Sequence, residues 1–230
     1  MTRILITGSS RGIGRAIALR LAGEGTTLLL HGRDRTALDQ VAAEVRERGA
    51  HAEVLVADLA DPVAVLALAD VVGSQPLDVL VNNAGAAVVK PLAELTLKDW
   101  QRSLAVGVTA PFLLMQKLAP VMPAGGTVVN VSSVAVRSPF PGWAAYATAK
   151  HALEGLTAVV REEMRAKQVR VINVYPAATD TDIWNKVPGD FPRDRMMPPE
   201  ETAEAVAYAL SRPAGVLVDS VHVGPLGGNL

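Results

Sequence analysis

The 230-residue chain predicts an α/β fold, in which a doubly wound parallel sheet flanked by helices forms one domain over residues 1–230. Two observations support this prediction. Short apolar runs alternate with segments of helical spacing, the order expected of parallel strands joined by right-handed crossovers. Half of the residues are hydrophobic but only 4% are aromatic, which suits aliphatic strands between helices better than a β-sandwich. No linker, repeat or low-complexity tract divides the chain.

Composition narrows the classes of function. The formal net charge of −1 gives no reason to expect a nucleic acid or an anionic membrane as a partner. The absence of cysteine excludes disulfides and thiolate chemistry and removes the usual sign of secretion. An apolar run begins at Ile4 without a signal peptide, and Asp70 and Asp78 interrupt the most apolar region. We therefore expect a soluble, cytoplasmic protein with no membrane span and no metal site.

The first element is a strand at Ile4–Thr7, followed by a glycine-rich turn and a helix from Arg15 to Ala22. This order aims a helix N-terminus and bare backbone N–H groups at a phosphate. The turn has the spacing G-x-x-x-G-x-G, in which Gly8 allows a tight turn while Gly12 and Gly14 allow a pyrophosphate and the neighbouring strand to approach. A glycine-rich turn without a ligand is the alternative, and the position at the first strand–helix junction favours the phosphate site.

The second strand, Thr26 to Leu30, indicates the choice of cofactor. Many NAD-binding folds place an acidic residue at the end of this strand, where it accepts from the ribose 2′-hydroxyl. Here Gly32 stands at that position, Arg33 follows, and Arg11 lies in the glycine-rich turn. Two planar guanidinium groups suit a 2′-phosphate, so NADP(H) is favoured and NAD(H) remains possible. The alternative is that both are solvated surface arginines.

The later elements continue the alternation of strand and helix. Asp34 and the pair Asp61-Pro62 are helix-capping signals. The polar stretch Asn82–Gly85 either closes a turn or fixes the strand edge beside a cofactor. The expected strands are 54–57, 77–81, 127–131, 169–174 and 216–223. The expected helices are 34–49, one that opens at Asp61-Pro62, 97–119 and 199–210, and Gly107 and Pro111 are expected to weaken or bend the third of these. Residues 183–197 are expected to form a mobile lid or loop.

The most informative stretch runs from Ser133 to Lys150. Tyr146 and Lys150 are spaced i, i+4 at the start of a predicted helix, so the phenol and the ammonium can point at one site. A neighbouring positive charge lowers the pKa of a tyrosine and moves it toward useful acid–base chemistry. Ser133 follows an apolar strand, at the edge where a parallel sheet binds ligands. Alone, the pair is more often an interfacial tyrosine beside a solvated lysine.

Together these motifs resemble the short-chain dehydrogenase/reductase family in its compact single-domain branch. The motifs stand in family order along nearly the whole chain: Thr7-Gly8-x-x-x-Gly12-Ile13-Gly14, Asn82-Asn83-Ala84-Gly85, Ser133 and Tyr146-x-x-x-Lys150. The resemblance implies a Rossmann-type sheet of about seven strands and NAD(P)-dependent hydride transfer between alcohols and carbonyls. It also suggests a homotetramer or homodimer formed through the helices at 97–119 and 146–164.

The resemblance further implies roles for individual residues. Tyr146 would be the general acid or base, Ser133 would hold the substrate oxygen, and Lys150 would contact the nicotinamide ribose and lower the tyrosine pKa. Asp58 and Leu59 would lie near the adenine, and Thr179 and Thr181 near the carboxamide. The full expected cofactor site is Gly8, Ser10, Arg11, Gly12, Ile13, Gly14, Arg33, Asp58, Leu59, Asn83, Ala84, Gly85, Tyr146, Lys150, Pro176, Thr179 and Thr181.

Three departures from the family pattern bear on activity. Gly107 stands where the family commonly has an Asn that supports a water relay, Ala177 replaces a usual Gly, and residues 221–225 match the closing strand only loosely. The favoured function is an NADP(H)-dependent oxidoreductase acting on a small or medium, partly apolar ketone or secondary alcohol. The alternative is a catalytically impaired NADP(H)-binding regulator or scaffold of the same fold, motivated by Gly107.

The substrate site is expected from three segments: Ala86–Val89, Val134–Trp143 and the lid around Trp184. The aromatic residues Phe140, Trp143 and Trp184 suggest an apolar substrate face, unless they only pack the loops. Three arginines could pair with a carboxylate or phosphate tail, although solvated charges are the simpler reading: Arg137, Arg193 and Arg195.

Overall fold

The strands form one parallel sheet in the order β3-β2-β1-β4-β5-β6-β7. This computed structural model describes residues 1–187, 189, 191–213 and 215–227. The order reverses direction between β1 and β4, which places the switch point of the doubly wound sheet there. The predicted fold class and strand number are confirmed. The strands are β1 Thr2–Thr7, β2 Thr26–Gly32, β3 His51–Val56, β4 Val79–Asn82, β5 Thr127–Val131, β6 Arg170–Pro176 and β7 Ser220–Val223.

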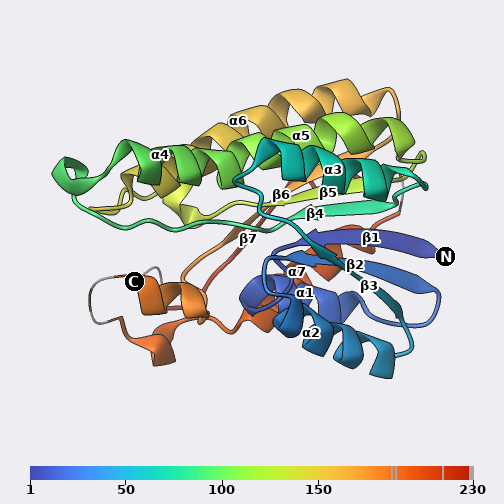
Figure 1. Cartoon of the computed structure of the whole chain (residues 1–230), viewed down its shortest axis with the longest axis horizontal. Coiled ribbons are helices and arrows are strands. Elements are labelled where there is room, and N and C mark those ends of the chain that lie inside the picture. The colour runs from blue at the N-terminus through green and yellow to red at the C-terminus, as the bar shows by residue number, and fades with distance from the viewer. Residues whose placement is uncertain (188, 190, 214, 228–230) are drawn as a thin grey trace.

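Helices cover both faces of the sheet (Figure 1). One layer contains α1 Gly12–Leu21, α2 Arg35–Glu47 and α7 Pro199–Leu210, and the other contains α3 Pro62–Gly73, α4 Leu97–Leu104, α5 Ala110–Leu118 and α6 Ala144–Arg165. The expected helix caps are present: the Asp34 side chain accepts from the Ala37 N–H, and the Asp61 side chain accepts from the Val63 N–H. These caps satisfy N–H groups that the helix itself leaves unpaired.

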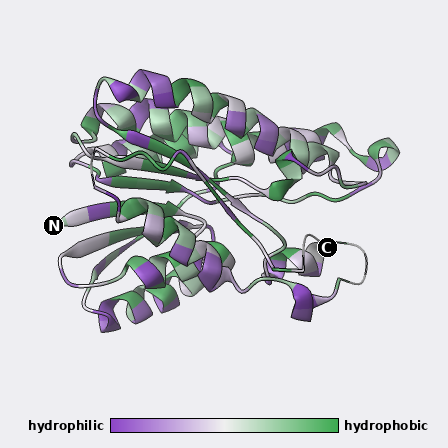
Figure 2. Cartoon of the chain, turned by 180° about the vertical axis from the view of Figure 1, so that it is seen from behind, coloured by the Kyte–Doolittle hydropathy of each residue, from purple (hydrophilic) through white to green (hydrophobic). Residues whose placement is uncertain are grey.

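Alternation along the strands divides the apolar core in two. In β1, Ile4 and Ile6 pack in the cluster under α1, α2 and α7, whereas Leu5 packs in the cluster under α3, α5 and α6. In β2, Leu28 and Leu30 face the first cluster and Leu29 the second. Because both faces are covered, the central strands are mostly apolar, and green segments run through the sheet between helices of mixed hydropathy in Figure 2.

Most strand boundaries differ from the sequence-based expectation by one or two residues, and the starts of β3 and β7 differ by three and four. β3 begins at His51, three residues before the apolar run, because it is an edge strand whose side chains alternate between exposed and half-buried positions. β7 begins at Ser220 rather than Val216. Val216 and Leu217 are 45% and 42% exposed, and pairing with β6 starts only at Asn173 and Ser220. Apolar composition alone therefore overestimated the last strand.

The predicted weak point of the long helix is a change of helical geometry. α4 passes into a π-helical turn, η2 Ala105–Thr109, before α5 begins, and a 3-10 turn, η3 Ala119–Val121, follows α5. Gly107 lies inside the π turn, where a Cβ would stand 2.9 Å from the Ala149 Cβ of α6. Gly107 therefore permits a close helix–helix contact that any larger side chain would disturb.

The composite helix Leu97–Val121 also corrects our expectation that no apolar stretch reaches transmembrane length. Its mean hydropathy of 1.5 over the tested window makes it long and apolar enough to span a membrane by composition alone. In the fold, 44% of that window is buried. Val106, Ala110 and Leu114 pack in the apolar cluster on the sheet, which is the position of a core helix.

A row of asparagines crosses the sheet beneath α6. Asn82 of β4, Asn130 of β5 and Asn173 of β6 stand directly opposite one another in the strand register. The Asn82 amide donates to Asn130 Oδ1 at 2.8 Å, and the Asn130 amide donates to the Thr157 hydroxyl of α6 at 2.8 Å. Thr157 in turn donates to the Leu153 carbonyl. The row therefore ties two strands to the helix that carries Tyr146 and Lys150.

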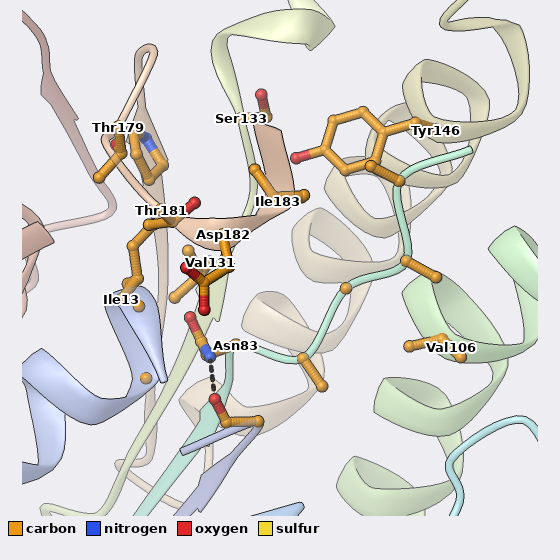
Figure 3. Close-up of a pocket in the computed structure, with 18 of the residues that line it drawn as sticks. Ile13, Asn83, Val106, Val131, Ser133, Tyr146, Thr179, Thr181, Asp182 and Ile183 are labelled. Carbon is orange, nitrogen blue, oxygen red and sulfur yellow. Dashed lines mark hydrogen bonds between the residues drawn. The ribbon is translucent and has the colours of Figure 1, made fainter. Parts of the chain in front are cut away.

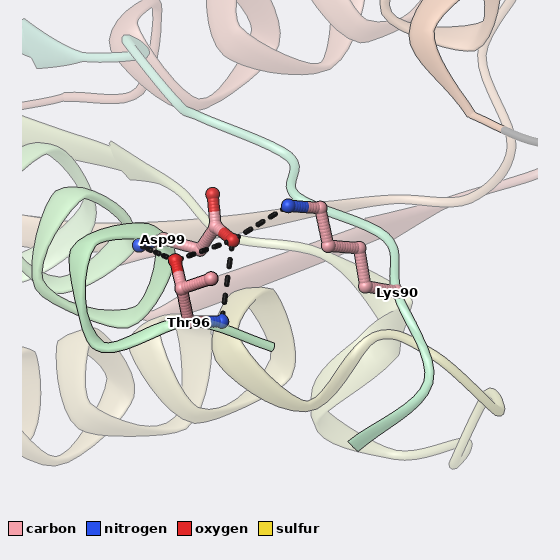
Figure 4. A network of polar contacts seen from close by, with 3 residues as sticks. All are labelled: Lys90, Thr96 and Asp99. Carbon is pink, nitrogen blue, oxygen red and sulfur yellow. Dashed lines mark hydrogen bonds and ion pairs between the residues drawn. The ribbon is translucent and has the colours of Figure 1, made fainter. Parts of the chain in front are cut away.

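The loop that follows β4 is fastened to α4 by one ionic network (Figure 4). Lys90 Nζ lies 2.7 Å from Asp99 Oδ2, and the same oxygen accepts from the Thr96 hydroxyl in the capping box of α4. These bonds lower the pKa of Asp99 to about 2. The Lys90 N–H also donates to the Gly142 carbonyl. The network therefore joins two loops that border the pocket described next.

Candidate active site

A pocket of about 440 Å³ lies at the carboxyl ends of the strands. It is lined by the glycine-rich turn, the ends of β2 to β6, the start of α6 and the segment around η5 Asp182–Lys186. This is the edge at which open parallel sheets bind ligands, on either side of the switch point. Every predicted catalytic and cofactor-binding residue lines this one pocket.

The glycine-rich turn forms a cradle that side chains would fill. Gly8 and Gly12 have φ values of 68° and 53°, which glycine adopts without strain. A Cβ on Gly14 would stand 2.1 Å from the Gly8 carbonyl oxygen, so only glycine fits there. α1 starts at Gly12, and its first turn carries no acidic residue. The positive end of the helix dipole and its N–H groups therefore face the pocket, as a bound pyrophosphate requires.

Thr7 and Asn83 join this turn to the loop after β4. The Thr7 hydroxyl accepts from the N–H groups of Asn83 and Ala84 and donates to the Val81 carbonyl. The Asn83 amide donates to the carbonyls of Thr7 at 2.9 Å and Gly8 at 3.2 Å; Figure 3 shows Asn83 inside the pocket. Of the two readings of Asn82–Gly85, these bonds support the one in which the stretch fixes the strand edge.

His31 is a site residue that the sequence reading missed. It is 2% exposed, its Nδ1 accepts from the Gly8 N–H at 3.4 Å, and its Nε2 lies 3.2 Å from the Ala57 carbonyl, to which it donates. Its own carbonyl accepts from the Ser9 N–H and hydroxyl. Burial lowers its pKa to about 4, so it is neutral at physiological pH. A polar residue directly before Gly32, at the end of an apolar strand, was the available signal.

The charged side chains that line the pocket, other than Arg33 and Lys150, form two oppositely charged pairs. Arg33 lines the pocket beside Gly32, as predicted. Arg11 lies 3.9 Å from Asp182, and Asp58 lies 3.7 Å from Arg102 of α4. The side chains of the first pair are 56% and 55% exposed, so that pair contributes little to stability. Arg102 and Asp182 are pocket residues absent from the sequence-based set.

The Ser133 and Tyr146 hydroxyls point into the same part of the pocket (Figure 3). Lys150, one helical turn after Tyr146, is 4% exposed, and its Nζ donates to the Val131 carbonyl at 2.6 Å. Nζ stands 5.6 Å from the Tyr146 ring centroid. Burial lowers the pKa of Lys150 to about 8. The i, i+4 spacing thus brings both side chains to one site, as expected.

The expected direction of the Tyr146 pKa shift is wrong. Burial raises the pKa of the phenol above its usual value, and the nearby Ser133 hydroxyl opposes that rise. Removing a phenolate from water is unfavourable, and this effect exceeds the stabilisation that the lysine was expected to provide. The phenol is therefore protonated at neutral pH.

The segment after β6 lies across the pocket. Trp184 of η5 donates its indole N–H to the Thr179 carbonyl at 2.8 Å. Arg193 of η6 Arg193–Arg195 bonds the Asp180 carboxylate at 2.5 Å and the Thr181 carbonyl at 3.0 Å. Thr179, Thr181, Ile183 and Trp184 all line the pocket. Pro188 and Asp190 of the predicted lid lie outside the described residues.

The other expected substrate residues divide into two groups. Ala86 to Val88 and both Phe140 and Trp143 line the pocket, as does Phe191, which the sequence reading placed in the lid without a role. The arginines Arg137, Arg193 and Arg195 do not line it. Arg137 lies over the Tyr175 ring at 5.5 Å, and Arg193 is held by the lid bonds above. Their absence from the pocket lining gives no support to the alternative in which they pair with an anionic substrate tail.

Comparisons with known proteins agree with this geometry. A family model described as short chain dehydrogenase matches residues 2–190. The chain is 37% identical over 192 residues to a 3beta-hydroxysteroid dehydrogenase from Mediterraneibacter gnavus, an alignment covering 82% of this chain and 70% of that protein. Two solved structures, both holding NADP, are similar. A metagenomic short-chain oxidoreductase has a TM-score of 0.85 and 34% identity, with 97% of each chain covered. A short chain dehydrogenase from Burkholderia cenocepacia has a TM-score of 0.87 and 33% identity, with 96% of each chain covered.

The sheet order, the glycine cradle and these similarities all lead to the same family. Among the described residues, no group of three or more histidine, aspartate or glutamate side chains could hold a metal ion. The chain belongs to the short-chain dehydrogenase/reductase family of NAD(P)-dependent oxidoreductases.

Proposed function

We propose that this protein uses NADP(H) to interconvert a small or medium, partly apolar ketone and its secondary alcohol. The proposal rests on one observation: a site suited to a cofactor pyrophosphate and a pair of hydroxyls suited to a carbonyl oxygen line the same pocket. A glycine cradle suited to a pyrophosphate lies at one side, and the Ser133 and Tyr146 hydroxyls lie together at another. A binding module without turnover has little need of two hydroxyls and a buried lysine at one strand edge.

The chemical roles follow from the positions of the side chains. When bound, the reduced nicotinamide supplies a hydride, that is, two electrons and a proton nucleus, to the carbonyl carbon. Tyr146 gives its phenolic proton to the carbonyl oxygen, and Ser133 hydrogen-bonds that oxygen. The raised pKa of Tyr146 keeps the phenol protonated, which suits its role as the acid in reduction. Lys150 supports the phenol from one turn along α6 and lies close enough to the pocket to contact a ribose.

The charge at the ends of β2 and β3 supports NADP(H) over NAD(H). Arg11 and Arg33 both line the pocket, and Gly32 occupies the position where an acidic residue would repel a 2′-phosphate. Asp58, which lines the pocket just after β3, lies 3.7 Å from Arg102. The similar structures that hold NADP are consistent with this choice. NAD(H) remains a weaker ligand in this proposal.

The proposal is tested by mixing the purified protein with NADPH and a panel of ketones, and with NADP+ and a panel of secondary alcohols. We expect a substrate-dependent change in nicotinamide absorbance that the Tyr146→Phe variant lacks. Tight NADPH binding with no turnover of any carbonyl or alcohol would instead support the regulator or scaffold, the function motivated by Gly107.

We also propose that the protein is a homo-oligomer and that it is located in the cytoplasm. α4 and α5 lie beside α6 on one face of the sheet (Figure 1). Phe112 of α5 is 41% exposed and Val159 of α6 is 58% exposed, so both helices present apolar side chains to solvent. We propose that a second copy covers these helices in a dimer or tetramer. Sedimentation equilibrium of the wild type and of a Phe112→Glu variant tests this, with dissociation expected for the variant.

A further inference from the structure

We propose that the substrate is an uncharged ketone or alcohol whose reacting carbon belongs to, or adjoins, an aromatic or alicyclic ring. This inference rests on the proposed function, and it adds the chemical class of the substrate. It is carried by the distribution of aromatic side chains and of charge around the two hydroxyls.

Aromatic residues in this chain are concentrated at the pocket. The sequence has only three Phe, three Trp and three Tyr. Tyr175 is the one aromatic residue found in the buried core of the described chain, which is otherwise aliphatic. In contrast, the pocket is lined by five aromatic side chains: Phe140, Trp143, Tyr146, Trp184 and Phe191. The need to fill the core therefore does not account for the aromatic residues at the pocket, whereas contact with a ring of the substrate does.

These rings form a continuous wall that begins at the reacting phenol. Trp143 meets Tyr146 edge-on with centroids 5.3 Å apart, and it meets Trp184 edge-on at 5.8 Å. Trp184 continues to Phe191 at 4.7 Å. The wall thus extends from the start of α6 across to the lid. A ring bonded to the reacting carbon would lie against it, since aromatic pairs favour such offset and edge contacts.

The wall presents little polarity to a ligand. The indole N–H of Trp184 is already donated to the Thr179 carbonyl. Two other segments that line the pocket, Ala86 to Val88 and Val134 to Ala135, contribute small aliphatic side chains. A sugar or other polyol would leave hydroxyl groups facing this surface without partners, which is unfavourable.

Charge around the hydroxyls also selects against an anion. Besides Lys150, the charged side chains that line the pocket are Arg11, Arg33, Asp58, Arg102 and Asp182. Arg11 lies near Asp182 and Asp58 near Arg102, so each of these two arginines already faces a carboxylate. Lys150 is buried and bonded to Val131. Of the cations in the described pocket lining only Arg33 remains, and the proposed function assigns it to the 2′-phosphate of the cofactor. A carboxylate or phosphate on the substrate would therefore lack a cation of its own.

Matched ketones test the charge and the ring separately. With NADPH, we expect kcat/KM for methyl para-acetylbenzoate to exceed that for para-acetylbenzoate by about 100-fold, because only the second carries a charge into the pocket. We expect alpha-tetralone to exceed acetone by a similar factor of about 100, because acetone leaves the wall uncovered. Equal or better turnover of the carboxylate, or of acetone, would overturn the inference while leaving the proposed oxidoreductase intact.

Variants of the wall provide the second measurement. Trp184→Ala should lower kcat/KM for alpha-tetralone about tenfold more than it lowers kcat/KM for acetone, because only alpha-tetralone loses a ring contact. Trp184→Phe should recover most of the loss because it restores a ring. Trp100→Ala is the matched control, since Trp100 lies on α4 and does not line the pocket. An equal loss with acetone and alpha-tetralone would contradict the ring contact. No turnover of any carbonyl by the wild type would refute both the inference and the proposed function.

Discussion

The Lys150 ammonium donates a 2.6 Å hydrogen bond to the carbonyl of Val131, the last residue of β5. Ser133 follows Val131 closely, so one strand end places both the lysine and the serine. Asn130, on the other side of Val131, is bonded to Thr157 of the same helix. Two hydrogen bonds therefore hold Lys150 in place: one from its own ammonium group to β5, and one between β5 and Thr157, two turns further along α6.

Replacing Lys150 by Met should abolish turnover while increasing the free energy of unfolding. Because burial lowers its pKa to about 8 from 10.5, the charged lysine destabilises the fold by about 3 kcal/mol at neutral pH. Lys150→Met removes that charge but leaves the Val131 carbonyl unpaired, so we expect a net gain of about 1–2 kcal/mol and a loss of turnover. Wild-type stability should rise as pH increases from about 8 toward 10.5, and the variant should not show this rise. Urea unfolding across this range checks both expectations.

Tyr146→Phe should keep the fold and the affinity for NADPH but lose turnover by about 100-fold or more, the range of general acid–base catalysis. Only the hydroxyl is removed, so the edge contact with Trp143 persists. Steady-state kinetics and a cofactor titration of the same preparation measure the two quantities. Near-normal turnover would remove the phenol from the mechanism.

Arg33→Ala should weaken NADPH binding more than NADH binding. A charge-assisted contact with the 2′-phosphate contributes about 1.5–3 kcal/mol, and NADH lacks that group. Fluorescence titration of both cofactors measures the difference, with Arg137→Ala as the control because Arg137 does not line the pocket. A wild-type preference for NADH would contradict the proposed cofactor.

Gly107→Asn should destabilise the protein, contrary to what helix propensity alone suggests. The new Cβ would stand 2.9 Å from the Ala149 Cβ, so α4–α5 and α6 must separate. Overpacking of this kind costs about 1–3 kcal/mol, whereas replacing a helical glycine by Asn gains less than the roughly 1 kcal/mol that Ala would give.

Gly155→Ala is the control for Gly107→Asn, because Gly155 lies on α6, the helix of Ala149, and nothing lies within 4 Å of its Cβ position. That variant should be more stable than the wild type. Thermal unfolding compares the two. A higher melting temperature for Gly107→Asn than for the wild type would show that the contact with Ala149 does not exclude a larger side chain. The change in turnover of that variant would then test whether the Asn common in the family contributes to catalysis.

His31 should make the protein sensitive to mild acid. Its pKa is lowered to about 4 from 6.5 by burial, so its neutral form stabilises the fold above 6.5 and that contribution is lost as pH falls toward 4. The loss is on the order of 3 kcal/mol. We expect His31→Gln to lose less stability over the same range in urea unfolding. An identical acid dependence in both proteins would show that other groups dominate.

Residues with a local signal were predictable from the sequence. Gly8, Gly12 and Gly14 stand at a strand–helix junction, and Tyr146 and Lys150 stand one helical turn apart on one helix face, and all five line the pocket. The strands were predictable for a similar reason, because both faces of the sheet are covered and apolar runs mark them.

The remaining features depend on contacts between segments distant in sequence. The proximity of Gly107 to Ala149 arises from the packing of two helices, and no pattern near either residue contains it. The rise in the Tyr146 pKa depends on burial by the surrounding loops, which outweighs the neighbouring charge that the spacing reveals. The start of β7 depends on where β6 offers a partner rather than on its own apolar residues.

The asparagine row has a consequence for how the sheet assembles. If β5 slipped by one residue against its neighbours, Asn130 would turn to the opposite face, among Val81, Val129 and Val174. The side chains of that cluster are apolar and offer no hydrogen-bond partner. A buried amide without partners costs about 1–3 kcal/mol, so a one-residue shift of β5 against β4 and β6 is penalised during folding. The asparagines that anchor α6 in the native protein thus also disfavour this shifted strand register during folding.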